Sequence, residues 1–329
     1  MAQKAKKANQ NLAKAKDAKQ DEFYTQPDDI EEELKHYKKH FRGKTVYCNC
    51  DDPDISEFSK FFKAKFNEWG LKRLITTCYK NENPSERSRN DSKHGVCLDW
   101  DGKKKTTRPL EGDGDFRSGE CVALLEQADI VVTNPPFSLF REYVAQLVEH
   151  GKKFVILGNK NAITYKDVFK LIKENRMWIG VTPMGADLLF DVPEEYAKTM
   201  VATGKEGSNY KVVDGIVKGR AQACWFTNLD TRKRHNDLIL YETYTPDEYP
   251  KYDNYDAINV NKTKDIPMDY DGTMGVPVTF LDKYNPDQFE IVGIDRILVE
   301  KLTGKVSRFH IEGKEIYARI VIKNKKAGA

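Results

Sequence analysis

The sequence has no long hydrophobic run. No stretch of its 329 residues approaches the roughly 20 apolar residues that a membrane-spanning helix needs. The first residues also lack the apolar core of a secretory signal peptide. We therefore expect a soluble globular protein that works in the cytoplasm.

Cysteine and histidine are scarce and scattered, which disfavours both disulfides and metal sites. Six cysteines in a chain of this length, without an export signal, fit reduced thiols. Cys48 and Cys50 are one residue apart, but no second pair stands at zinc-finger spacing. Four histidines that show no ligand spacing are His94, His150, His235 and His310. We expect packed thiols and no metal.

Positive charge is concentrated at one end of the chain. Residues 1–20 hold six lysines and one acid, so they carry +5 while the other 309 residues carry −2. A basic arm of this kind can reach a polyanion, although a solvated leader is an equally simple interpretation. Two further basic clusters are Lys103–Lys105 with Arg108, and Arg232–Arg234. The candidate phosphate contacts are Lys4, Lys7, Lys14, Lys104, Arg108, Arg232 and Arg234.

Short apolar runs alternate with helical patterns along the first two thirds of the chain. This alternation predicts βαβ units and a mainly parallel sheet. Residues 80–119 are expected to be mostly loop, with one short strand near 95–100. Residues after about 230 read as a mixed β and loop module. The predicted strands are 45–49, 71–79, 128–133, 153–158, 177–181 and 224–227, and the predicted helices are 28–41, 56–69, 120–127, 138–148 and 165–175.

The loop Asn134-Pro135-Pro136-Phe137 directly follows a predicted strand and precedes a predicted helix. Open α/β sheets bind ligands at this end of their strands. Proline fixes its φ and lacks an N–H, so the loop is stiff and offers free carbonyls. An amide oxygen, a carbonyl oxygen and a ring suit a planar group that carries an exocyclic NH2. The alternative is a surface turn built from good turn residues.

Two other segments combine aromatic residues with polar ones. Phe23-Tyr24-Thr25 precedes the first predicted helix, and Gly112–Ser118 precedes the strand before the Asn-Pro-Pro-Phe loop. In the latter, Asp115 offers a hydrogen-bond acceptor and Phe116 a flat apolar face, which together suit an aromatic ring that carries an amino group. Taken alone, Asp115 equally indicates an acidic residue in a solvated turn.

Together these motifs resemble those of amino methyltransferases, and the chain resembles the EcoRI-type adenine-N6 DNA methyltransferase family. The resemblance spans about residues 21 to 325. It rests on residues 21–26, 46–53, 112–118, 129–143 and 249–267. It implies a Rossmann-like methyltransferase sheet with an appended mixed β/loop DNA-recognition region, S-adenosylmethionine as donor, and a flipped-out adenine in double-stranded DNA as acceptor. The implied domains are a basic tail (1–20), a catalytic domain (21–230) and a target-recognition module (231–329).

The resemblance also assigns residue roles. The implied catalytic residues are Asn134, Pro135, Pro136 and Phe137, and the implied cofactor-binding residues are Phe23, Tyr24, Thr25, Asn49, Cys50, Asp51, Asp115 and Phe116. The loop from Asn49 to Pro53 lacks the glycines common in the wider class, and the second strand lacks a terminal acid. We expect a monomer, with a cognate restriction endonuclease that forms no stable complex with it. The alternatives are a protein glutamine N5-methyltransferase and an inactive DNA-binding relative.

Overall fold

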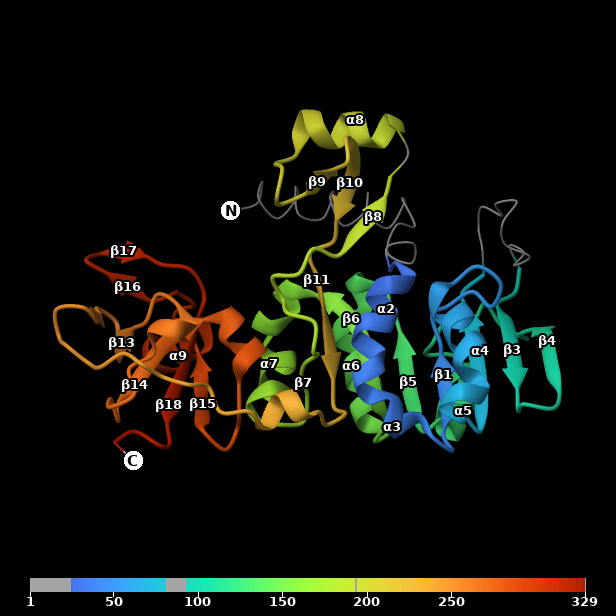
Figure 1. Cartoon of the computed structure of the whole chain (residues 1–329), viewed down its shortest axis with the longest axis horizontal. Helices are drawn as coiled ribbons and strands as arrows, with labels where there is room; N and C mark the ends of the chain where they lie inside the picture. Colours follow the sequence, from blue (N-terminus) through green and yellow to red (C-terminus); the bar gives the residue numbers. More distant parts are fainter. Residues whose placement is uncertain (1–24, 81–92, 193, 329) are drawn as a thin grey trace. The chain divides into compact units, whose positions relative to one another are not determined.

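The computed structural model describes residues 25–80, 93–192 and 194–328. They form two compact units, which are coloured along the chain in Figure 1. Unit 1 contains the described residues up to Lys160 together with Ala186–Leu229, and unit 2 contains Asn161–Gly185 together with the residues from Asp230 onward. The candidate residues Lys4, Lys7, Lys14, Phe23 and Tyr24 lie outside the described ranges.

Unit 1 is built on a mixed sheet. Its strands are β1 (Thr45–Cys48), β2 (Arg73–Cys78), β3 (Val96–Trp100), β4 (Lys105–Pro109), β5 (Ile130–Thr133), β6 (Lys153–Asn159) and β11 (Ala223–Thr227). They are ordered β4-β3-β2-β1-β5-β6-β11. The four central strands β2, β1, β5 and β6 are parallel, whereas β3, β4 and β11 run antiparallel to their neighbours. The expectation of a mainly parallel sheet is therefore right only for the centre.

The helices of unit 1 begin and end at the residues that local chemistry favours. Ser56 caps α4 by accepting a hydrogen bond from the Phe58 amide, and Gly70 ends it with a φ of 65°. Ser118 caps α5 in the same way. The helices are α2 (Pro27–Leu34), η1 (Lys35–Tyr37), α3 (Lys38–Phe41), α4 (Glu57–Trp69), α5 (Gly119–Gln127), η2 (Phe137–Leu139) and α6 (Phe140–Glu149), and η3 (Lys160–Thr164) spans the boundary between the units.

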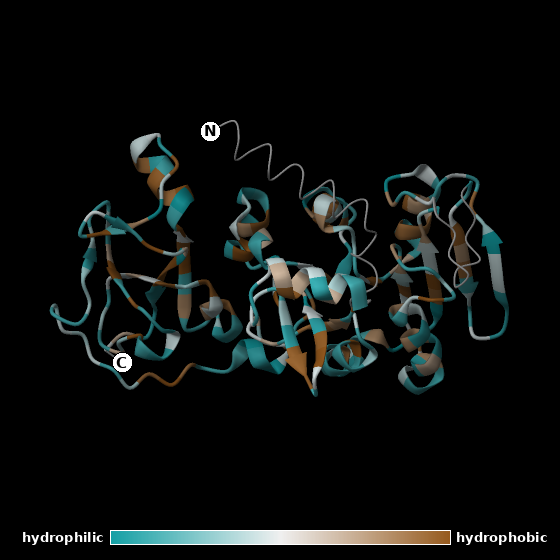
Figure 2. Ribbon diagram, turned by 90° about the horizontal axis from the view of Figure 1, so that it is seen from above, coloured by the Kyte–Doolittle hydropathy of each residue, from teal (hydrophilic) through white to brown (hydrophobic). Residues whose placement is uncertain are grey.

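Strand β4 was not predicted. All of its residues are exposed, and Figure 2 draws this outermost strand in teal and white, without brown. An exposed edge strand has no buried face, so its sequence lacks the apolar alternation by which strands are recognised.

The order of the parallel strands reverses between β1 and β5. From β1 the chain proceeds to β2 on one side, whereas β5 and β6 lie on the other. The carboxyl ends of β1 and β5 are therefore the point at which the strand order reverses, and ligands of open α/β sheets bind there. The segments that leave these two ends are Asn49–Pro53 and the Asn-Pro-Pro-Phe loop.

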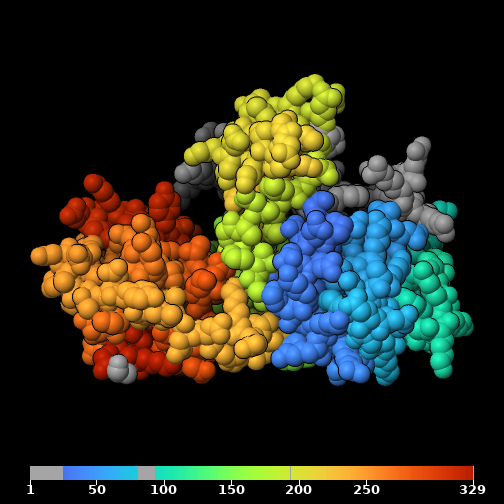
Figure 3. All heavy atoms as spheres, in the orientation of Figure 1, coloured from blue at the N-terminus to red at the C-terminus, as the bar shows by residue number. Residues whose placement is uncertain are grey.

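A small sheet projects from unit 1. Its strands are β8 (Leu189–Asp191), β9 (Tyr210–Val213) and β10 (Ile216–Arg220), in the order β8-β10-β9, and α8 (Glu194–Thr203) accompanies them. Figure 1 shows these elements in yellow and yellow-green beyond the carboxyl ends of the parallel strands, and Figure 3 shows the same elements as a projection at the top of the view. Residues next to this sheet therefore reach the same end of the fold as the Asn-Pro-Pro-Phe loop.

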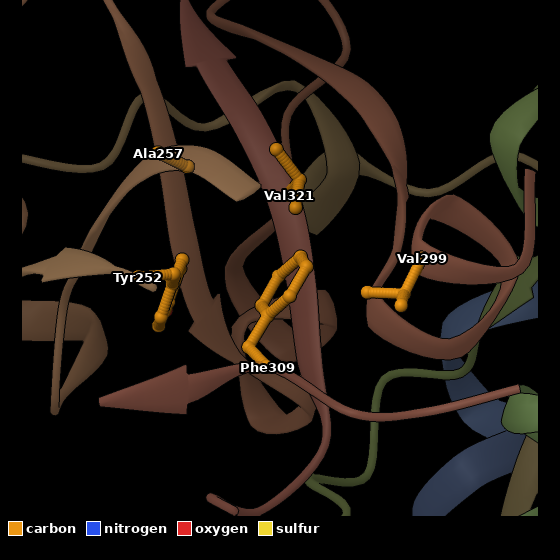
Figure 4. Packing of buried hydrophobic residues seen from close by; sticks show 5 residues of the cluster. All are labelled: Tyr252, Ala257, Val299, Phe309 and Val321. Atoms are coloured by element: carbon orange, nitrogen blue, oxygen red, sulfur yellow. The ribbon is translucent and has the colours of Figure 1, made fainter. Parts of the chain in front are cut away.

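Unit 2 has a five-stranded sheet of its own. Its order is β12-β13-β14-β18-β15. Buried side chains from several elements pack on it, and Figure 4 shows Tyr252, Ala257, Val299, Phe309 and Val321. The elements are α7 (Lys166–Lys173), β7 (Trp178–Ile179), η4 (Arg232–His235), β12 (Lys251–Tyr252), β13 (Tyr255–Asn259), η5 (Thr263–Asp265), β14 (Thr273–Pro277), η6 (Val278–Lys283), β15 (Phe289–Ile294), α9 (Asp295–Thr303), β16 (His310–Ile311), β17 (Lys314–Glu315) and β18 (Arg319–Asn324).

None of the helices within the described ranges is long and apolar enough to cross a bilayer. All six cysteines lie in the described part of the chain, where they are buried and form no disulfide.

Candidate active site

The Asn-Pro-Pro-Phe loop lies at the carboxyl end of β5. Asn134 is 3% exposed, and Pro136 and Phe137 are partly exposed. The loop leads through the short turn η2 into α6. Phe140, the first residue of α6, packs on Phe226 with ring centroids 5.0 Å apart. The loop is thus held between a buried strand and an anchored helix.

A pocket in unit 1 contains the side chains of this loop. Asn134 and Phe137 line it together with Thr25 and Asp29 from the start of α2. Its other walls are Leu157, Leu188, Ala221 and Ala223. Thr25 is 8% exposed, and its hydroxyl has no hydrogen-bond partner within the described part of the chain. The pocket therefore combines an amide, a hydroxyl, a carboxyl group and a ring.

The predicted cofactor residues Asn49 and Phe116 are brought together by a residue that was not predicted. The Tyr143 hydroxyl donates a hydrogen bond to Asn49 Oδ1, and the Tyr143 ring meets the Phe116 ring edge-on with centroids 5.0 Å apart. Gln146, one turn further along α6, donates to the Phe116 carbonyl at 3.1 Å. Asn49 Nδ2 and Gln146 Oε1 are buried without a partner among the described residues.

Asp51 connects the two loops that leave β1 and β5. Its carboxylate accepts hydrogen bonds from the hydroxyls of Ser56 at 2.6 Å and Thr133 at 2.5 Å. Its amide donates to the Thr77 carbonyl on β2. Because Thr133 directly precedes Asn134, Asp51 ties the β1 loop to the Asn-Pro-Pro-Phe loop. Burial raises the pKa of Asp51 to about 7. The neighbouring Cys50 is also buried.

Asp115 is held by Arg117. The Arg117 guanidinium donates to both carboxylate oxygens, at 2.9 and 2.7 Å, and keeps the pKa of Asp115 below its usual value. The same guanidinium lies 5.3 Å from the centroid of the Phe116 ring. In the described structure, Arg117 therefore occupies the Asp115 carboxylate and lies near one side of the Phe116 ring, the two groups that the family resemblance implies for cofactor binding.

The four described candidate phosphate contacts have different surroundings. Lys104 is exposed, and Arg108 pairs with Glu120 at 2.8 Å. In unit 2, Arg232 is exposed. Arg234 lies over the Trp178 ring at 3.7 Å and donates to Asn175 at 3.0 Å.

Sequence reasoning missed Asp29, Tyr143 and Gln146. Asp29 belongs to the acidic first turn of a helix that begins at a proline, a common helix start that carries no functional signal. Tyr143 and Gln146 are three residues apart, so they share one helix face. That spacing, in the helix that follows the Asn-Pro-Pro-Phe loop, is the signal that could have identified them.

A stiff polar loop at the strand-order reversal of a mixed α/β sheet, beside buried polar atoms without partners among the described residues, is an arrangement that fits an enzyme of the methyltransferase class. The comparison with known families is specific. The family named "Adenine-specific methyltransferase EcoRI" matches residues 11–325. The chain belongs to this family and is an adenine-specific methyltransferase.

Curated relatives cover almost the entire chain. It is 48% identical over 328 residues to the type II methyltransferase M.EcoRI of Escherichia coli, covering 97% of both chains. It is 40% identical to M.MpnI of Mycoplasma pneumoniae and 39% identical to M.MgeORF184P of Mycoplasma genitalium, covering 95% of this chain and 98% of each relative. No solved structure matches.

Proposed function

We propose that this enzyme transfers a methyl group from S-adenosylmethionine to N6 of an adenine flipped out of duplex DNA at a specific site. The observation that carries this proposal is the position of Asn134 in a pocket at the reversal of the strand order. A base inside the duplex cannot reach such a pocket, so the target must leave the stack at a cost of roughly a few kcal/mol. We further propose that the sheet is Rossmann-like.

The buried polar atoms of unit 1 fit S-adenosylmethionine as the methyl donor. Asn49 Nδ2 and Gln146 Oε1 lie buried without partners in the described part of the chain, next to Phe116. They can satisfy the donors and acceptors of an adenine ring stacked on Phe116. When bound, S-adenosylmethionine supplies an electrophilic methyl group on a sulfonium. We propose that Phe23, Tyr24, Thr25, Cys50 and Asp51 complete its site, and that Arg117 moves aside to free Asp115.

The roles of the loop follow from the electronic structure of the acceptor. The lone pair of adenine N6 is delocalised into the ring, so the nitrogen is a poor nucleophile. The Asn134 side-chain oxygen and the Pro135 carbonyl can each accept one N6 hydrogen, which turns the lone pair out of the ring plane. Pro136 stiffens this arrangement, and Phe137 stacks on the base. Positioning of this kind accelerates the transfer without a strong base at the attacking step.

We propose that the target is chosen outside this pocket. Residues 231–329 would read the bases, and a site resembling GAATTC is the first to test. Residues 21–230 would then carry the chemistry, and the tail 1–20 would follow the phosphates. We also propose that the enzyme acts as a monomer in the cytoplasm and forms no stable complex with a cognate endonuclease. Light scattering on the enzyme with and without duplex DNA tests the oligomeric state.

The two alternatives make different predictions. A protein glutamine methyltransferase would need only the planar amide for which the loop is suited. Membership of an adenine-specific family supports the base as acceptor. An inactive relative would bind DNA without transferring a methyl group. Labelled methyl donor, incubated separately with duplex DNA and with protein substrates, distinguishes all three.

The test of the proposal is the substitution Asn134→Ala. We expect it to abolish methyl transfer, with a loss greater than roughly 10²-fold, while duplex DNA still binds. The matched control is Asn67→Ala, because Asn67 is exposed on α4 away from the pocket. Sequencing of methylated adenines in host DNA then gives the site. Full activity of Asn134→Ala would refute the assignment.

A further inference from the structure

The methylation reaction leaves a proton to be removed, and the loop that positions the base cannot hold it. The N6 lone pair forms the new N–C bond as the methyl group's bond to sulfur breaks, and that electron pair stays on sulfur. The nitrogen then carries a positive charge and two hydrogens. One N–H bond must break, leaving its electron pair on nitrogen. Amide and backbone carbonyl oxygens are far too weakly basic to keep that proton.

Asp29 is placed to accept it. Its side chain lines the same pocket as Asn134 and Phe137, beside the buried Thr25 hydroxyl. Among the described residues that line this pocket, Asp29 has the one ionisable side chain. It belongs to the first turn of α2, a helix fixed at its start by Pro27, so the carboxyl group is held by regular structure.

We propose that the Asp29 carboxylate accepts the N6 proton as positive charge develops on the nitrogen during methyl transfer, and later passes it to solvent. This inference rests on the proposed function. It adds a proton acceptor to a site in which Asn134 and Pro135 only accept hydrogen bonds.

The surroundings of Asp29 suit this role. Burial, aided by the charge of the adjacent Asp28, raises the pKa of Asp29 to about 6. A group with this pKa is ionised at neutral pH and still a useful base. The described residues that other elements contribute to the pocket walls carry no charge. They are Leu157 from β6, Ala223 from β11, and Leu188 and Ala221 from the chain that flanks the small sheet. Asp28 is therefore the charge that tunes Asp29.

The experiment compares Asp29→Asn with Asp28→Asn in single-turnover methylation from pH 5 to pH 8. For the wild type we expect a rate that falls about tenfold per pH unit below pH 6. Asp29→Asn should lower the plateau rate roughly 10²-fold and remove this decline. Asp28→Asn should keep the plateau and move the decline to lower pH, because it removes the neighbouring negative charge.

Two measurements do not depend on turnover. Carbon-13 labelling of the aspartate carboxyl groups should reveal a resonance that titrates near pH 6, disappears in Asp29→Asn and shifts to lower pH in Asp28→Asn. Duplex DNA with 2-aminopurine at the target position should gain the same fluorescence with Asp29→Asn as with the wild type, because base flipping precedes the proton step. If Asp29→Asn fails to fold, the pH profile of Asp28→Asn and the wild-type titration still test whether Asp29 is the proton acceptor.

Two results would overturn the inference. One is an Asp29→Asn enzyme with the wild-type rate and pH profile. The other is an enzyme with unchanged kcat and a raised KM for the donor, which would make Asp29 a donor-binding residue. In both cases the wild type still methylates DNA and the proposed function stands. A wild type that transfers no methyl group to DNA would instead refute the proposed function.

Discussion

At the residue scale, the loops that leave β1 and β5 are held together by Asp51, a carboxyl group buried at 5% exposure. It accepts hydrogen bonds from Ser56 and Thr133. Burial outweighs these bonds, so the pKa rises from 3.8 to about 7. The folded protein therefore keeps a proton on Asp51 at pH values where the unfolded chain has released it. The stability that this proton provides is complete below about pH 4 and is lost as the pH rises to about 7.

Asp51→Asn tests this linkage, because asparagine stays neutral at every pH. Relative to Asp51→Asn, the wild type should lose stability by at most about 1.4 kcal/mol per pH unit between pH 5 and pH 7. Above pH 7 the difference should become constant. Urea unfolding at pH 5, 6, 7 and 8 measures it. Stability curves that run parallel over the whole range would show that Asp51 does not titrate in this window.

At the element scale, sequence patterns predicted the structure where burial imposes a regular period. The central strands β1, β2, β5 and β6 and the capped helix α4 lie where their apolar patterns place them. Strand β4 escaped prediction because it is exposed. Helix α9 escaped because only Asp295 and Val299 are buried, too few for a helical period.

The residues of the candidate site were likewise predictable from the sequence only in part. The four residues of the Asn-Pro-Pro-Phe loop are contiguous in the sequence, so their residue types were enough to predict the chemistry of the loop. The link between Asp51 and Thr133 joins residues 82 positions apart, and Asp29 meets Asn134 only through the packing of α2. Neither neighbourhood leaves a local pattern in the sequence.

The short helix η4 carries two arginines for which we predict different effects. Arg234 stacks on Trp178 and donates to Asn175, and burial lowers its pKa. Arg234→Ala should therefore reduce the free energy of unfolding by about 1–2 kcal/mol. The exposed Arg232 serves as the matched control. Arg232→Ala should change stability by less than about 0.5 kcal/mol and reduce the salt slope of DNA binding by about 1.

Urea unfolding and DNA titrations at several salt concentrations separate these effects. Equal losses of stability for the two variants would contradict the structural role of Arg234. A salt slope unchanged in Arg232→Ala would remove Arg232 from the candidate phosphate contacts.

At the scale of the whole molecule, charge is distributed unevenly between the tail and the rest of the chain. Residues 1–20 carry +5 and the remaining residues −2. The body thus offers little net attraction for DNA, and a long-range attraction to the phosphates has to come from the tail or from local clusters such as the one at Lys104. Attraction of this kind changes affinity and association rate, but not a chemical step inside a pocket of unit 1.

Deletion of residues 1–20 should therefore weaken DNA binding at low salt and leave the single-turnover rate at saturating DNA unchanged. The slope of log K against log salt should decrease by about 0.9 for each lysine that contacts a phosphate. A full-length variant with Lys4, Lys7 and Lys14 changed to Gln separates charge from length, and it should reproduce up to three such decrements. If both variants retain the wild-type slope, the tail does not contact DNA. If the deletion alone slows the chemical step, the residues before Asp21 act on the pocket rather than on the phosphates.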